Sequence, residues 1–134
     1  MKQWMLIGLL ATAATLTAQE RELHLKADIP FEFQAGPTTS PAGTYDVKYR
    51  QGWLVLQDAK GGVHSYLISD AIANEQRPRS ATLVFAHYGD RYFLREVWPS
   101  DSPEGRQLPA TKAEIAAART VRPEASTTIV ARNR

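Results

Sequence analysis

Residues 81–98, with the sequence ATLVFAHYGDRYFLREVW, decide the fold, because hydrophobic pattern, turn chemistry and composition all indicate a β-hairpin there. Gly89 and Asp90 lie between two runs rich in β-branched and aromatic residues. Glycine at the first central position supplies the positive φ that a type II′ turn needs. The sequence therefore predicts two antiparallel strands joined by a two-residue loop.

A two-residue loop also fixes how the two strands pair, and so the face on which each side chain lies. A three-residue loop would place Phe85 opposite Arg95 and mix apolar with polar groups, so the two-residue register is preferred. That register pairs the following residues: Tyr88 with Arg91, His87 with Tyr92, Ala86 with Phe93, Phe85 with Leu94, Val84 with Arg95, Leu83 with Glu96 and Ala81 with Trp98. Alternation then predicts a core face made of Leu83, Phe85, Tyr92, Leu94 and Trp98.

Glu96 is the odd residue of this hairpin, because the preferred register puts it on the apolar face opposite Leu83. An unpaired buried carboxylate is costly. We therefore expect Glu96 at the margin of that face, or paired with an arginine from a third strand, in a structural role. Asp90 is expected to serve as a turn residue rather than as its partner in a catalytic carboxylate pair.

Length and composition are typical of one small globular domain: 134 residues, of which 43% are hydrophobic and 22% charged. The formal charge of +2 is small, and no basic stripe is interleaved with aromatic residues, so no nucleic-acid partner is expected. The absence of cysteine excludes disulfides, thiolate nucleophiles, cysteine-bound zinc, iron–sulfur clusters and lipid attachment at an N-terminal cysteine.

The N-terminus has the layout of a secretory signal peptide. Lys2 supplies a positive charge, residues 4–16 form a short apolar run, and small residues lead to Ala18. Cleavage is expected after Ala18, with Ala14 as the competing site and an uncleaved membrane anchor as the other reading. The run is short for an ordinary span. The sequence thus predicts export to the periplasm or the extracellular medium, with no stable membrane span after cleavage.

Three parts follow from this division: a signal peptide at 1–18, a β domain at 19–109, and a short helix with a flexible tail at 110–134. In the last part Thr111 and Glu114 match a capping box, which predicts a helix over 112–119. The segment beyond is expected to be loose and dispensable for folding, with a strand at 127–131 as its one regular element.

Alternating apolar residues mark further short strands before the hairpin, at 22–28, 31–33, 44–50, 53–57 and 63–68. Residues 36–43 and 69–80 are expected to be connections, the latter with one helical turn at 70–74. Together with the hairpin this gives about seven strands and predicts an all-β fold, an antiparallel meander forming a small sandwich or barrel. The expected core comprises Leu23, Leu25, Phe31, Phe33, Tyr45, Val47, Leu54, Leu56, Leu67, Leu83, Phe85, Leu94 and Trp98.

No combination of residues in the sequence predicts a catalytic, cofactor-binding or metal site. The histidines His24, His64 and His87 lie on three different expected strands without the spacing of a metal motif. Ser65 and His64 are neighbours on a strand and point to opposite faces, and no strained nucleophile turn occurs. Six aromatic residues can line a ligand groove, but cross-strand packing is the favoured reading: Tyr45, Tyr49, Trp53, Tyr66, Tyr88 and Tyr92.

Four segments resemble a group of small exported bacterial proteins of unknown function. These are the F-x-F at Phe31–Phe33, the Pro-Ala-Gly-x-Tyr turn at 41–45, the hairpin end at 88–98 and the Gly-Arg-x-Leu-Pro at 105–109. The resemblance covers roughly residues 20–110, with Ser40 where such proteins often have leucine. It implies export and a β-rich fold, and it brings no activity and no catalytic residue.

The sequence therefore predicts an exported, non-catalytic β domain that binds or supports something in the cell envelope or outside the cell, through its sheet surface. An envelope or protein partner fits this reading. A lipocalin-like carrier with an apolar ligand inside a barrel is the alternative, and a filled core would argue against it. An exported hydrolase is the third reading, disfavoured by the lack of a nucleophile or metal set.

Overall fold

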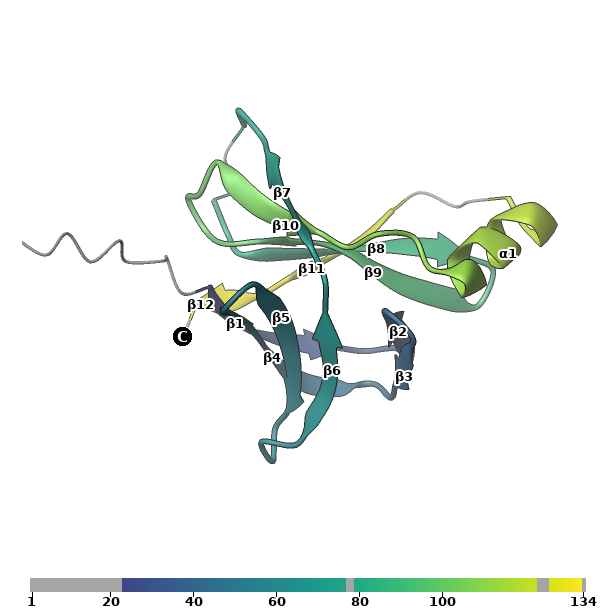
Figure 1. The fold of residues 1–134 in the computed structure, drawn as a ribbon, viewed down its shortest axis with the longest axis horizontal. Helices are drawn as coiled ribbons and strands as arrows, with labels where there is room; N and C mark the ends of the chain where they lie inside the picture. Colours follow the sequence, from purple (N-terminus) through teal and green to yellow (C-terminus); the bar gives the residue numbers. More distant parts are fainter. Residues whose placement is uncertain (1–22, 77–78, 123–125, 134) are drawn as a thin grey trace, which may run out of the picture.

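The computed structural model describes residues 23–76, 79–122 and 126–133; the predicted signal peptide and its cleavage site lie outside them. Two β-sheets pack face to face, and one short helix lies at one end of the second sheet (Figure 1). The all-β class is confirmed, with a sandwich rather than a barrel. The part of the chain that the structure describes contains no helix long and apolar enough to cross a membrane.

The first sheet is built from neighbours that pair in antiparallel fashion in the order β12-β1-β4-β5-β6. Gln51 and Gly52 join β4 to β5 with φ of +50° and +86°, the double positive φ of a type I′ turn. The strands of this sheet are β1 (His24–Ile29), β4 (Gly43–Arg50), β5 (Trp53–Asp58), β6 (Val63–Leu67) and β12 (Arg132–Asn133).

The second sheet has the order β11-β8-β9-β10-β7 and carries a small hairpin, β2–β3, on one side of β9. The contact of β2 with β9, at Gln34 and Phe93, is parallel, whereas the other pairings in this sheet are antiparallel. Its strands are β2 (Phe33–Ala35), β3 (Thr38–Ser40), β7 (Asp70–Ala73), β8 (Thr82–Tyr88), β9 (Arg91–Trp98), β10 (Glu104–Gln107) and β11 (Thr127–Val130).

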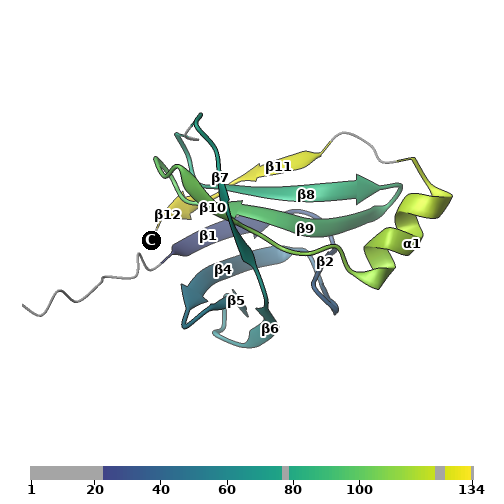
Figure 2. The ribbon, with the colours of Figure 1, turned by 45° about the horizontal axis from the view of Figure 1, so that its top comes forward.

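The chain passes from one sheet to the other at both edges of the sandwich. At one edge β6 leads into β7 through Ile68 and Ser69, and at the other β11 leads into β12 through Ala131 (Figure 2). Ala131 is 5% exposed, and its N–H donates to the carbonyl of Ala81 at 2.7 Å. Strands that switch sheets in this way form the corners of a sandwich.

The organising hairpin has the predicted turn and, near the turn, the predicted register. Gly89 has a φ of +59°, and Tyr88 pairs with Arg91 across the two-residue loop. Pairing continues as predicted to Phe85 and Leu94.

A β-bulge then shifts the hairpin register by one residue. Arg95 is the extra residue on β9, so Val84 pairs with Glu96, and Leu83 pairs with Val97. The predicted pairs of Val84 with Arg95 and of Leu83 with Glu96 are therefore wrong. The shift removes Glu96 from the apolar face and brings Val97 into the core, where it is 0% exposed.

Beyond the bulge Trp98 pairs with Thr82, not with the predicted Ala81. Its ring lies against Gly105 of the neighbouring strand β10, so closely that a Cβ at Gly105 would lie 2.5 Å from it. Trp98 is 7% exposed, but it lies on the face opposite to Val97, so its predicted place on the core face is wrong.

Side chains fill the space between the sheets. The rings of Phe33, Tyr45 and Phe85 meet edge to face, with centroids 5.2 Å and 5.5 Å apart. All predicted core residues except Phe31 and Trp98 belong to this core, and Phe31 and Tyr92 pack on it from its margin. The core also includes residues that were not predicted: Ala27, Ile29, Ala35, Ala81, Val97, Leu108 and Ala131.

Several segments expected to be irregular contain short strands. The predicted loop 36–43 includes β3, and the predicted helical turn at 70–74 is strand β7. The expected strand at 127–131 is confirmed as β11, but the tail is not loose: β11 pairs with β8, and β12 pairs with β1. The structure therefore places 127–133 within the β domain.

The helix α1 (Lys112–Thr120) begins as predicted. The hydroxyl of Thr111, the N-cap, accepts a hydrogen bond from the N–H of Glu114 at 3.2 Å. In a full capping box the Glu114 carboxylate would also accept the backbone N–H of Thr111. Here this carboxylate accepts a hydrogen bond from Arg95 instead.

Candidate functional site

A groove of about 610 Å³ lies on the outer face of the first sheet, over β4, β5 and β6. The strand pairing builds its floor: Val55 of β5 has Lys48 of β4 on one side and Tyr66 of β6 on the other. Side chains directly opposite on one face of a sheet contact one another, so these three form one continuous strip. Trp53 and Arg50, also a cross-strand pair, extend the strip toward the β4–β5 turn.

Two of the three aromatic side chains that line this groove are exposed, while the third, Tyr49, is partly buried against the core. Trp53 is 45% and Tyr66 is 63% exposed, and Ile68, two residues beyond Tyr66, is 66% exposed. By contrast, the phenylalanines of the core are almost fully covered, with Phe33 at 1%. A cluster of large apolar side chains on the surface is a typical mark of an interaction site.

The charge of the groove is positive. Lys48 and Arg50 line it, and none of the described residues that line it carries a carboxylate. Arg106 of β10 lies at its rim, with the guanidinium carbon 4.4 Å from the centre of the Tyr49 ring.

Arg106 also fixes this rim to the corner between the sheets. Its side chain donates to the Ser69 hydroxyl at 2.9 Å and to the Ser69 carbonyl at 2.6 Å. Apart from Gln51 in the β4–β5 turn, the lining residues of the groove lie on strands of the first sheet.

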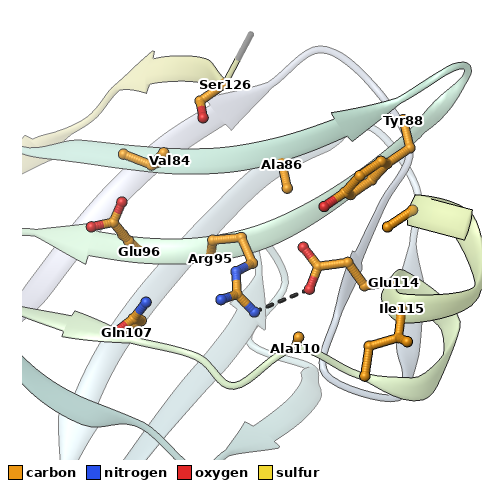
Figure 3. Close-up of a pocket in the computed structure, with 11 residues that line it drawn as sticks. Val84, Ala86, Tyr88, Arg95, Glu96, Gln107, Ala110, Glu114, Ile115 and Ser126 are labelled. Carbon is orange, nitrogen blue, oxygen red and sulfur yellow. Dashed lines mark hydrogen bonds and ion pairs between the residues drawn. The ribbon is translucent and has the colours of Figure 1, made fainter. Parts of the chain in front are cut away.

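A second cavity, of about 290 Å³, lies between α1 and the outer face of the second sheet (Figure 3). The bulge directs both Arg95 and Glu96 toward it, and an ion pair crosses it: Arg95 Nη1 lies 3.0 Å from Glu114 Oε2. Val84 and Ala86 of β8 form its apolar wall.

Glu114 is 5% exposed, and this burial raises the pKa of its carboxyl, while the nearby Arg95 lowers the pKa and offsets only part of the effect. The structure therefore explains both residues as the anchor of α1 on the sheet. The bulge places Glu96 on the outer face beside Gln107, and among the residues that the structure describes Glu96 has no ion pair that would give it the predicted structural role.

A chain of polar side chains links Ser40, His64 and Asp58. The Ser40 hydroxyl lies 3.2 Å from His64 Nδ1, and His64 Nε2 lies 3.0 Å from Asp58 Oδ2. These are the residue types of a hydrolase triad, and their separation in the sequence hid them from motif reasoning.

This cluster has a structural explanation. Ser40 is 0% exposed, so its hydroxyl has no access to a substrate. Asp58 accepts the backbone N–H groups of Gly62 and Lys60, at 2.8 Å and 2.9 Å, within the β5–β6 loop. The Gly62 N–H, followed by the His64 hydrogen bond, lowers the pKa of Asp58. The cluster fastens this loop to β3.

The three histidines have different partners in the structure. His24 lies 3.7 Å from Asp46, His64 belongs to the cluster above, and His87 stacks on Tyr92 with ring centroids 4.0 Å apart. Within residues 23–76, 79–122 and 126–133, no three potential metal-ligating side chains come together.

Of the six aromatic residues considered from the sequence, Trp53, Tyr66 and Tyr49 line the groove. Tyr45 and Tyr92 take part in ring packing, as cross-strand reasoning favoured. Tyr88 lines the cavity under α1.

Comparison of the chain with protein-family models, curated proteins and solved structures finds no match. The resemblance to small exported bacterial proteins therefore stays a prediction.

Proposed function

We propose that this protein is an exported, non-catalytic β domain that binds a ligand in the groove on the outer face of its first sheet. The carrying observation is the exposure of Trp53 and Tyr66 on a positively charged sheet face. Tyrosine and tryptophan are enriched where proteins bind partners, because each combines a large apolar ring with a polar group.

Two observations favour this reading over the alternatives. The space between the sheets is occupied by buried rings such as Phe33 and Phe85, which leaves little room for the internal ligand of a lipocalin-like carrier. The residues closest to a hydrolytic triad include a serine, Ser40, that is fully buried. Export rests on the leader-like pattern of residues 1–18.

A photo-crosslinking amino acid at position 66 tests the proposal in cells that produce the protein. Tyr66→p-benzoylphenylalanine places the probe in the groove, and Val130→p-benzoylphenylalanine places it on the equally exposed β11 of the second sheet. We expect an adduct from position 66 only. Its intact mass should report the bound species and an N-terminus at Gln19.

Two results would contradict the proposal. Equal adducts from both positions would show that the groove is not the binding surface. A full-length, cytoplasmic chain would show that the protein is not exported.

A further inference from the structure

We infer that the ligand of the groove is an acidic polysaccharide, a chain of sugar rings that carry carboxylates. This inference rests on the function proposed above and gives it a substrate class. It combines the two properties of the groove, exposed aromatic rings and an excess of positive charge.

The aromatic part fits sugar rings. A pyranose has one face of C–H groups that packs on an aromatic ring, while its hydroxyls stay at the edge, free for hydrogen bonds. Trp53 and Tyr66 offer two such rings, and Val55, only 8% exposed, forms an apolar floor between them. Gln51 and Gln57 line the same groove with amides that both donate and accept hydrogen bonds.

The charged part fits carboxylates. Lys48 and Arg50 lie in the groove, and among its described lining residues neither aspartate nor glutamate balances them. A guanidinium binds a carboxylate through two parallel hydrogen bonds, which gives geometric selectivity as well as attraction. A neutral sugar would leave both cations without a counter-charge.

The position of the groove favours a polymer that lies across the face of the sheet. The groove spans three neighbouring strands and is open to solvent, so a long ligand can continue beyond it. Addition of a peptide strand uses the edge of a sheet, whereas the groove lies on the face of the sheet, over β4, β5 and β6. The bases of a nucleic acid would also stack on the rings. However, the groove has only Lys48 and Arg50 among its described lining residues, and two cations neutralise few phosphates.

Binding of the purified exported protein to four polymers tests the inference, with tryptophan fluorescence as the readout. Polygalacturonate is the acidic sugar, dextran the neutral sugar, polyglutamate the acidic non-sugar and oligothymidylate the nucleic acid. We expect the tightest binding to polygalacturonate, weaker binding to dextran and little to the other two. Added salt should weaken the binding of polygalacturonate and leave that of dextran unchanged.

Variants separate the two contributions. Tyr66→Ala should weaken the binding of polygalacturonate about tenfold or more, as removal of a central aromatic contact does at binding sites. Lys48→Gln combined with Arg50→Gln should reduce polygalacturonate binding to the level of dextran. The matched control, Lys112→Gln with Arg122→Gln, removes the same charge from exposed positions at the start of α1 and just after it, and should leave the binding of polygalacturonate unchanged.

The outcomes distinguish this inference from the proposed function. Dextran bound as tightly as polygalacturonate, or a protein captured at position 66 with no glycan bound, would overturn the inference that the ligand is an acidic glycan. The proposed function, binding of a ligand in the groove, would stand. Equal binding of polyglutamate or oligothymidylate, unaffected by Tyr66→Ala, would show that charge alone acts. No polymer bound and no adduct at position 66 would overturn both.

Discussion

At the scale of single residues, the burial of Glu114 predicts how the stability of the fold depends on pH. Burial raises the pKa of Glu114 above its usual value of 4.5, and Arg95 offsets only part of this rise. A carboxyl with a raised folded pKa stabilises the fold fully below its unfolded pKa, and that contribution is lost as the pH rises through the folded pKa. Glu114→Gln cannot ionise, so its stability should not fall in that range.

The measurement is the melting temperature of both proteins as the pH is raised from about 4.5, the unperturbed glutamate value, to neutrality. The difference, variant minus wild type, should increase with pH. A difference that decreases instead would mean that the ion pair with Arg95 outweighs burial and that the pKa of Glu114 is lowered.

At the scale of elements, the hairpin makes the sharpest prediction. Gly89→Val forces a β-branched residue to a φ of +59° and should cost about 1–3 kcal/mol of unfolding free energy. The matched control is Gly43→Ala, because Gly43 has no positive φ and its added Cβ would make only an ordinary contact at 3.7 Å. Phe85→Ala should cost more than either, about 3–5 kcal/mol, because it empties a fully buried site.

Arg91→Ala completes the series and should cost little, since Arg91 is exposed at the end of the hairpin. Denaturant unfolding of the four variants gives the order. A larger loss for Arg91 than for Phe85 would be incompatible with the observed core face.

The hairpin also shows what the sequence can predict. Its turn depends on two adjacent residues, Gly89 and Asp90, and a local signal was enough. The bulge at Arg95 depends on what packs on both faces of β9, namely the core on one and α1 on the other. Periodicity within one strand does not contain that information, so Glu96 was placed on the wrong face.

The same reason applies to the candidate site. The sequence identified Trp53 and Tyr66 as possible groove residues, but alternation alone does not say which face of a strand is outside. The Ser40–His64–Asp58 cluster joins residues from β3, β5 and β6, so its members meet only once the strands are paired.

At the scale of the whole molecule, the C-terminal strands are the decisive test. Truncation after Val121 removes β11 and β12, which are one edge strand of each sheet, together with the buried Ala131. We expect a loss of several kcal/mol, which lowers the melting temperature by roughly 10–20 °C for a domain of this size. This replaces the sequence-based expectation that residues beyond Arg119 are dispensable.

Removal of Arg132 and the residues after it is the milder control, because it spares β11 and its pairing with β8. Calorimetry should show a smaller loss for this variant than for truncation after Val121. Equal and small losses of stability in both variants would mean that residues 127–133 contribute little to the stability of the sandwich.

The corner at Ala131 has a consequence for the order in which the chain can fold. β1 is among the first strands to be synthesised, yet β12, at the other end of the described chain, completes its pairing. The second sheet likewise waits for β11 beside β8. A polypeptide that emerges from a ribosome or a membrane channel N-terminus first therefore cannot finish either sheet until residues 127–133 are released, since contacts between distant segments form late. If the protein is exported as proposed above, this delay leaves both sheets incomplete until the last strands have passed the membrane.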